Sequence, residues 1–157
     1  MRTAIFLLFL LIALGYAARK GGGPERWMAG ILLLMLLADQ LLHLAVPVRY
    51  EAVDIGHFAI DIFGAVATAA LALVAHRFWP MAAAVLQLLP LLAHFSRFVN
   101  IAMHPAAYMI MQVSASWLLP PLLVLATWRH QQRLRRNGSD PSWQNLLRRS
   151  NRREPTR

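Results

Sequence analysis

Six polar side chains that could bind a ligand or carry protons interrupt the apolar stretches of this 157-residue chain. They are Asp39, His43, His57, Asp61, His94 and Gln112, which we call the polar layer. Asp39 and His43 are four residues apart, and so are His57 and Asp61, a spacing that places both members of each pair on one helix face. Because an ionisable residue inside an apolar helix is costly, such residues are expected to be paired or functional.

The six residues of the polar layer lie at similar distances from the midpoints of their apolar stretches. Counting 1.5 Å per residue from the midpoint of each stretch places all six about 4–12 Å toward the outer side. Successive stretches run antiparallel, so we expect the Asp39–His43 pair to meet the His57–Asp61 pair, carboxylate to carboxylate and imidazole to imidazole. His94 and Gln112 are expected to join this layer from the following stretches.

Three interpretations of the polar layer remain open. It could be structural, with side chains that hydrogen-bond across helices. It could be a metal or b-type haem site, for which the ligand candidates are His43, His57, His94, Asp39 and Asp61. It could also be a proton or solute path, although Gln87 is the only polar side chain expected in the inner half. The pair His57/Asp61 resembles half of the metal site of cation diffusion facilitator zinc transporters, but the resemblance covers only these residues and the facing Asp39/His43.

Five apolar stretches must position the polar layer. About 20 residues cross a ~30 Å hydrocarbon core, and all but the first stretch reach about that length. The sequence therefore predicts an all-α membrane protein with five transmembrane helices. Stretches two to five each carry a polar stripe, which predicts a four-helix core with the first helix at its periphery. The stretches are Thr3–Ala18, Trp27–Val46, Ile55–Ala75, Phe78–Phe95 and Ala107–Trp128.

Composition supports this class and excludes others. The chain is 58% hydrophobic and 15% charged, whereas soluble domains carry about 25% charged residues. We expect one transmembrane bundle over residues 1–128 and a basic tail over 129–157. The absence of cysteine excludes disulfides, thiolate metal sites and covalently attached haem. The net charge of +9 comes largely from nine Arg in the tail, a placement that indicates membrane topology and anionic lipids rather than nucleic acid.

The distribution of basic residues predicts the orientation. The segment Arg19–Arg26, the His76–Arg77 corner and the tail are basic, so the positive-inside rule places them in the cytoplasm and the N-terminus in the periplasm. Within the first segment, Gly21–Pro24 is expected to form a flexible turn. The first stretch could instead be a cleaved signal peptide, but the positive charges directly after it favour a retained span.

The tail is expected to form a helix over Arg129–Arg136, stop at Asn137–Gly138 and restart at Asp140 and Pro141 as a short amphipathic helix carrying Trp143. Such a basic amphipathic segment contacts anionic lipids or an acidic partner. The residues expected to make that contact are Arg129, Arg133, Arg135, Arg136, Trp143, Arg148, Arg149, Arg152 and Arg153.

The sequence carries none of the common enzyme motifs, such as HExxH, GxSxG, a P-loop or a dinucleotide fingerprint. Small size, missing catalytic motifs and a basic tail favour a non-enzymatic accessory or structural subunit. Its expected partners are anionic lipids and a membrane protein or a second copy of the chain.

Four short motifs run along the chain: Pro24–Arg26 (PER), Gly56–Asp61 (GHFAID), Phe78–Pro80 (FWP) and Asp140–Trp143 (DPSW). On these motifs the chain resembles small multi-pass membrane proteins of alphaproteobacteria, particularly sphingomonad-like ones, a group to which no activity is attached. The resemblance implies a bacterial inner-membrane location and nothing about mechanism.

Overall fold

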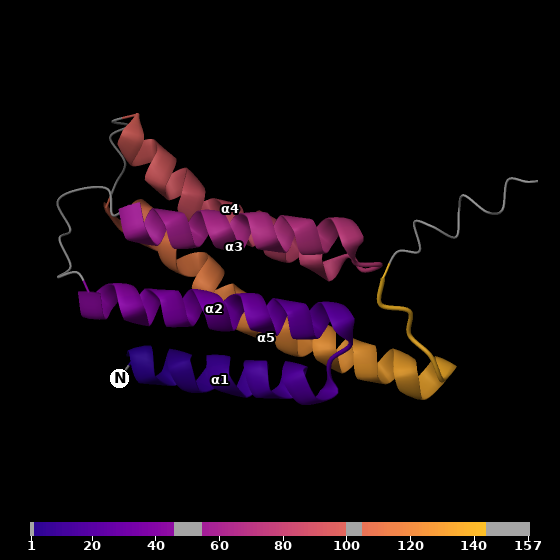
Figure 1. Ribbon diagram of the computed structural model, residues 1–157. Coiled ribbons are helices and arrows are strands. Elements are labelled where there is room, and N and C mark those ends of the chain that lie inside the picture. Colours follow the sequence, from indigo (N-terminus) through magenta and orange to yellow (C-terminus); the bar gives the residue numbers. More distant parts are fainter. Residues whose placement is uncertain (1, 46–54, 100–104, 144–157) are drawn as a thin grey trace, which may run out of the picture.

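Five helices make up the described part of the chain (Figure 1). A computed structural model of the protein describes residues 2–45, 55–99 and 105–143. The predicted all-helical fold is confirmed, since these residues form no β-strand and only one isolated bridge. Each apolar stretch corresponds to one helix. The helix ends lie within a few residues of the predicted ones, except that the last helix continues to Asn137. The helices are α1 (Arg2–Lys20), α2 (Gly23–Ala45), α3 (Ile55–Val74), α4 (Trp79–Phe98) and α5 (Pro105–Asn137).

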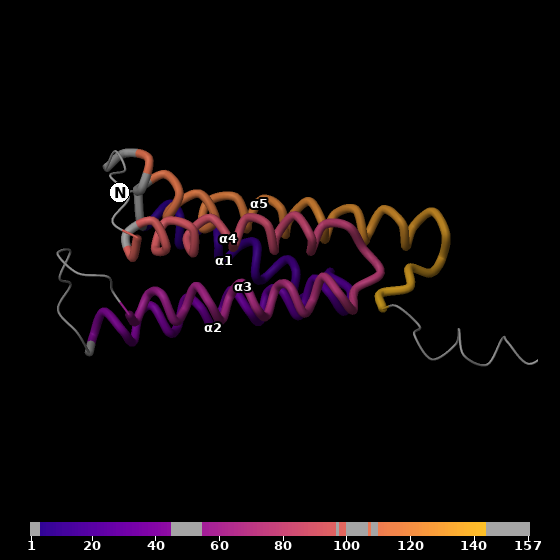
Figure 2. The backbone as a smooth tube through the Cα atoms, turned by 90° about the horizontal axis from the view of Figure 1, so that it is seen from above, coloured from indigo at the N-terminus to yellow at the C-terminus, as the bar shows by residue number. Residues whose placement is uncertain are grey.

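The helices lie along a common direction and form a closed ring of neighbours. Figures 1 and 2 together show α2 and α3 side by side in one layer, with α4 and α5 side by side in a second layer. Each helix packs against the next one in the chain, and α1 also packs against α5, which closes the ring. Polar side chains from different helices can therefore face one shared interior.

The first helix is part of the core, contrary to the expectation that it is peripheral. Leu10, Ala13, Leu14 and Ala17 of α1 are buried between α2 and α5. The expectation rested on polar stripes, whereas the buried side chains of α1 are apolar or small. Close approach through small residues is a common way for apolar helices to associate.

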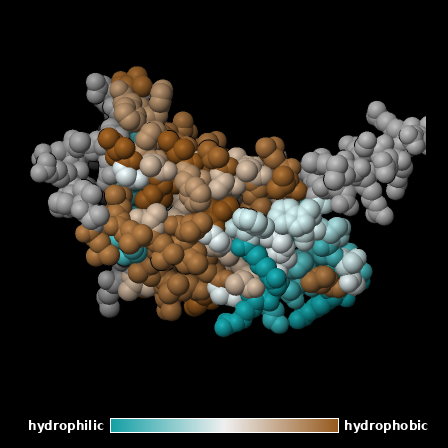
Figure 3. Space-filling view, in the orientation of Figure 1, coloured by the Kyte–Doolittle hydropathy of each residue, from teal (hydrophilic) through white to brown (hydrophobic). Residues whose placement is uncertain are grey.

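The outer surface of the bundle is apolar over most of its length. Large apolar side chains such as Leu8, Leu41 and Phe78 are well exposed. Figure 3 shows hydrophobic residues over most of the visible face. Contiguous apolar surface of this extent is typical of proteins that contact a membrane. Within the described residues, four helical segments are long and apolar enough to cross a membrane, namely Gly23–Leu44, Ile55–Val74, Trp79–Ser96 and Ile110–Asn137.

One end of the bundle collects the basic side chains, and we call it the basic end. It holds the α1–α2 corner, the α3–α4 corner and the C-terminal end of α5. Figure 3 shows hydrophilic residues gathered there. The exposed basic side chains at this end are Arg19, Lys20, Arg26, His76, Arg129, Arg135 and Arg136.

Helix α5 continues well past the apolar stretch that predicted it. The expected helix over Arg129–Arg136 is confirmed as the direct continuation of α5, and the expected stop at Asn137–Gly138 is also confirmed. Gly138 has a φ of 67° and its N–H donates to the carbonyl of Leu134. A glycine in the left-handed conformation ends a helix without the steric cost that a side chain would bring.

The α1–α2 corner is tightly packed rather than a flexible turn. The N–H of Gly21 donates to the carbonyl of Ala17 at 2.8 Å, and Gln131 of α5 donates its side-chain N–H to the carbonyl of Lys20. A methyl group on Gly21 would lie 2.4 Å from the Ala17 carbonyl oxygen and 2.7 Å from Cβ of Glu25. Since the first of these is a backbone atom, the corner accepts only glycine at this position without rearrangement.

We therefore expect Gly21→Ala to lower the free energy of unfolding by about 1–3 kcal/mol, the usual cost of overpacking. Gly30→Ala is the matched control, because a methyl group on Gly30 of α2 meets nothing within 4 Å. The control should be neutral or slightly stabilising, since Ala is the better helix former. Thermal unfolding of both variants in the same detergent, followed by circular dichroism, measures the difference. Equal stability of the two variants would contradict the packed corner.

Candidate functional site

Three residues of the polar layer meet between α2 and α3. Nε2 of His57 lies 3.2 Å from Oδ1 of Asp39, and Nδ1 of His43 lies 3.6 Å from the same oxygen. The rings of His43 and His57 meet edge to face with their centroids 5.1 Å apart. One ligand-capable atom from each of the three residues lies within 4.8 Å of the other two. We call these three residues the α2–α3 triad.

The other three residues meet between α3, α4 and α5. His94 of α4 is buried, and its Nε2 lies 3.1 Å from Oδ2 of Asp61 and 3.1 Å from Nε2 of Gln112. Phe58 covers the imidazole with an edge-to-face contact at 5.4 Å. This second group lies deeper in the protein than the α2–α3 triad, whose side chains are all partly exposed.

The structure thus gathers the polar layer in two groups, and the pairing differs in one respect from that expected. The two imidazoles on α2 and α3 do meet. Each carboxylate, however, contacts an imidazole, Asp39 that of His57 and Asp61 that of His94. Two carboxylates side by side would repel one another in an apolar environment, whereas a carboxylate and an imidazole attract and can share a proton.

The arrangement does not fit a b-type haem held between His43 and His57. A bis-histidine haem needs the two imidazoles to approach one iron from opposite faces of the porphyrin. At 5.1 Å and edge to face, the two rings contact each other and leave no room for a porphyrin between them.

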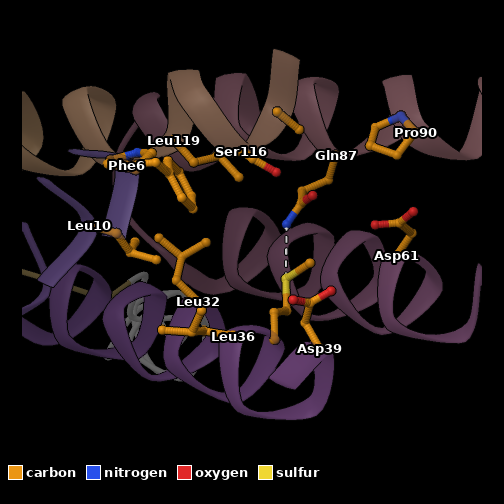
Figure 4. A pocket seen from close by; sticks show the side chains of 13 residues that line it. Phe6, Leu10, Leu32, Leu36, Asp39, Asp61, Gln87, Pro90, Ser116 and Leu119 are labelled. Atoms are coloured by element: carbon orange, nitrogen blue, oxygen red, sulfur yellow. Dashed lines mark hydrogen bonds between the residues drawn. The ribbon is translucent and has the colours of Figure 1, made fainter. Parts of the chain in front are cut away.

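A cavity of about 180 Å³ lies among the five helices and connects to the polar layer. Asp39 and Asp61 line it at one end with Gln87 nearby, and Figure 4 shows Phe6 and Leu10 of α1 among the apolar side chains toward the other end. The buried amide of Gln87 donates to the sulfur of Met35 at 3.3 Å (Figure 4). The interior therefore carries polar groups on the side of the polar layer and an apolar wall on the other side.

Gly64 allows α3 to come close to this cavity wall. A methyl group at Gly64 would lie 2.6 Å from the sulfur of Met35 and 2.8 Å from Nε2 of Gln87. Small side chains of α3 are buried here, at Gly64, Ala65 and Thr68. This close approach brings the polar groups of α2, α3 and α4 within reach of each other.

A second set of buried charges lies at the basic end, where the sequence analysis predicted exposed lipid contacts and no buried ion pairs. Glu25 at the start of α2 is completely buried. Its Oε1 accepts a hydrogen bond from Nε1 of Trp79 at 3.2 Å and lies 3.6 Å from Nε of Arg77. The Arg77 side chain is itself buried. A buried carboxylate and a buried guanidinium thus compensate each other across the α2 and α3–α4 ends.

Asp140 connects this pair to α5. Its carboxylate accepts hydrogen bonds from Nδ1 of His130 at 2.6 Å and from Nε of Arg133 at 3.1 Å, and it lies 2.8 Å from Nη2 of Arg77. Burial raises the pKa of Asp140, but the hydrogen bonds from His130, Arg77 and Arg133 together outweigh it and hold the pKa below its ordinary value. We call Glu25, Arg77, His130, Arg133 and Asp140 the basic-end ion network.

The first residues of the tail are bound to the bundle. The N–H of His76 donates to the carbonyl of Ser142 at 3.2 Å, and Ala75 forms an isolated antiparallel bridge with Trp143. A methyl group on Gly23 would lie 2.6 Å from the indole of Trp143, so the indole packs directly on the α2 terminus. Asp140 therefore secures the chain against the bundle, where the sequence predicted that it caps a new helix. The remainder of that predicted amphipathic helix lies outside the described residues.

A groove of about 500 Å³ lies between α4 and α5 beside the ion network. Arg77, Arg129 and Arg133 line it, and Asp140 is the only acidic residue among its described lining residues. The rest is largely apolar and includes Phe78, Trp79, Ala82, Leu122, Leu125 and Ala126. We call it the α4–α5 groove.

The residues expected to contact lipid or a partner are divided between several environments. Arg129 is exposed at the edge of the α4–α5 groove, while Arg135 and Arg136 are exposed farther along α5. Arg133 is half-exposed and paired with Asp140. Trp143 is held against Gly23, as described above. The remaining residues of that set, Arg148, Arg149, Arg152 and Arg153, lie outside the described part of the chain.

The scarcity of acidic residues is a signal in the sequence that points to the members of the ion network. The described part of the chain includes four acidic residues, and each contacts an Arg or a His; they are Glu25, Asp39, Asp61 and Asp140. In a chain with 16 Lys and Arg but only seven Asp and Glu, each acid has many possible partners. The scarcity of acids therefore marks them as structural anchors, but the sequence does not say which cation each one selects.

Asp140→Asn should destabilise the protein at pH 7 by about 1–3 kcal/mol, because it leaves buried N–H groups of Arg77 and His130 without a charged acceptor. The folded-state pKa of Asp140 is lowered, so its stabilising contribution is present above the unfolded value of about 3.9 and is lost as the pH falls through the folded pKa. The unfolding temperatures of wild type and variant, measured against pH, should therefore differ at pH 7 and converge in acid. A constant difference down to the lowest pH would contradict the assigned role.

No protein-family model, no curated protein and no solved structure matches this chain. What the protein does must therefore be inferred from its own residues and their geometry.

Proposed function

We propose that the chain is a polytopic membrane protein with a non-enzymatic, accessory role, and that its basic end binds an anionic lipid in the α4–α5 groove. The observation that carries the proposal is the composition of this groove, which combines three Arg side chains with apolar lining residues at the end of apolar helices. Four long apolar helices in the described part of the chain are consistent with a membrane protein.

The charges in the groove favour an anion. Three guanidinium groups face one carboxylate, which leaves a positive excess among the described lining residues. Nη2 of Arg133 is buried and has no hydrogen-bond partner among the described residues. Phosphate oxygens are strong acceptors for guanidinium N–H groups, so a phosphate in the groove would satisfy this donor.

The apolar part of the groove favours a lipid over a free phosphate. Leu122, Leu125 and Ala126 line the groove along α5, where an acyl chain could follow the apolar surface of the bundle. Trp27 and Trp128 are exposed at the same end, as is usual for tryptophans at a membrane interface. A phosphate headgroup at the Arg side chains with its acyl chains along α5 matches both halves of the groove.

The proposed location is a bacterial inner membrane, crossed by five spans, with the N-terminus in the periplasm and the basic end in the cytoplasm. In this orientation the Arg side chains of the groove face the anionic leaflet, to which each basic residue contributes about 1 kcal/mol of attraction. Helix α1 would be the fifth span, supported by its buried face between α2 and α5. The tail beyond Trp143 remains a second proposed contact for anionic lipids, a membrane-protein partner or another copy of the chain.

Arg129→Gln tests the lipid site, because Arg129 lines the groove without belonging to the ion network. We expect it to weaken binding of phosphatidylglycerol about fivefold, equivalent to ~1 kcal/mol for one charge near the headgroup. Native mass spectrometry or fluorescence quenching in vesicles of phosphatidylglycerol and phosphatidylcholine measures the preference. Arg135→Gln is the matched control, since it removes the same charge from the same helix outside the groove.

Equal losses in Arg129→Gln and Arg135→Gln would mean that general charge attraction, and not the groove, selects the lipid. Competition by soluble glycerol phosphate as strong as that by the lipid would show that the apolar half of the groove is not used. Either result would contradict the proposed lipid site.

Reporter fusions test the proposed topology. Fusions at Glu51 and after Met1 should report the periplasm, and those at Gly22, at His76 and after Trp143 should report the cytoplasm. A periplasmic signal after Trp143 would reverse the orientation, and opposite compartments for Gly22 and His76 would rule out five spans.

A further inference from the structure

We infer that the α2–α3 triad, Asp39, His43 and His57, is a binding site for a divalent transition-metal ion of the zinc class. The site is distinct from the α4–α5 groove, and it lies toward the opposite end of the bundle. Two imidazoles and one carboxylate are a ligand set that Zn²⁺ and similar ions commonly use when a fourth position is left to water or another ligand.

The spacing of the ligand atoms suits one ion. Bonds of about 2.0–2.1 Å in a tetrahedral arrangement place neighbouring ligand atoms roughly 3.3–3.4 Å apart. Nε2 of His57 and Oδ1 of Asp39 are already 3.2 Å apart, and the ligand-capable atoms of all three residues lie within 4.8 Å. The ligand atoms that lie farthest apart therefore have to approach by at most about 1.5 Å when an ion binds.

The surroundings of the triad hold its side chains as a metal site requires. Nδ1 of His43 donates to the backbone carbonyl of Asp39 at 2.8 Å. Metal-bound imidazoles usually donate their second N–H to a carbonyl or carboxylate, which fixes the ring and the tautomer. Nε2 of Gln40 lies 3.4 Å from Oδ2 of Asp39, an outer contact on the oxygen that faces away from His57.

The triad is also open to an incoming ion. The side chains of His43, Asp39 and His57 are 43%, 35% and 30% exposed. The Asp61–His94 pair is not part of this cluster of ligand atoms, and His94 is buried under Phe58. Of the five predicted metal ligands, the three residues of the triad are therefore accessible to an ion, whereas Asp61 and His94 contact each other inside the protein.

A bound ion would join α2 to α3 near the ends that the segment 46–54 connects. Because an ion that binds only the folded state raises its stability, Zn²⁺ should increase the melting temperature. It would also replace the proton-mediated contact between Asp39 and His57 by two bonds to the metal, and so fix the α2 side of the central cavity, which Asp39 lines.

The test uses the full-length protein, stripped with a chelator and titrated with Zn²⁺ in detergent. We expect one Zn²⁺ per chain by elemental analysis, with imidazole scattering at the zinc absorption edge and a raised melting temperature. His43→Gln and His57→Gln should each weaken binding by more than the ~10–100-fold typical of losing an outer-shell partner. His76→Gln is the matched control, because it removes an exposed histidine at the basic end.

Three results would overturn the inference. They are the absence of stoichiometric Zn²⁺, an unchanged affinity in both triad variants, and an equal loss in His76→Gln, which would indicate surface binding. Should a histidine variant fail to fold, Asp39→Asn serves instead. It preserves the size of the side chain and removes its charge, so a folded Asp39→Asn protein with wild-type zinc affinity would also overturn the site.

Discussion

The cost of placing a charge among apolar helices governs this structure. A carboxylate without water or a partner is so unfavourable that it either takes up a proton or finds a cation. Within the described part of the chain, every acidic residue contacts an Arg or a His, whether near the basic end or in the polar layer. These pairs determine which helix ends meet, because each acid and its partner come from different segments.

The two ends of the bundle use this constraint differently. At the basic end, Asp140 contacts two Arg side chains and His130, and these contacts hold the α3–α4 corner, α5 and the start of the tail together. In the polar layer the partners are imidazoles, which can be neutral, protonated or bound to a metal. The basic-end ion network is therefore suited to holding the chain together, and the polar layer is suited to exchanging a ligand.

Small residues make both arrangements possible. Gly21 lets the α1–α2 corner close onto the Ala17 carbonyl, and Gly64 lets α3 approach Met35 and Gln87. Helix α1 joins the ring with Ala13 and Ala17 fully buried. Since apolar helices gain little from hydrophobicity alone when lipid surrounds them, close packing at such positions accounts for much of their association.

The helical elements of this protein follow from its sequence, because an apolar stretch of this length satisfies its backbone hydrogen bonds within itself only as a helix. Their number, their approximate ends and the stop at Gly138 follow from hydropathy and from the conformational freedom of glycine. The spacing of Asp39, His43, His57 and Asp61 also placed these residues on faces of neighbouring helices. The partners are visible only in the packed bundle, where Asp61 pairs with His94, Asp140 pairs with Arg77, and α1 buries one face in the core. Residue spacing along a helix defines which side chains share a face. The choice of an Arg or His partner at a similar depth depends also on how each helix is rotated about its axis and on how closely the helices approach, which small side chains determine.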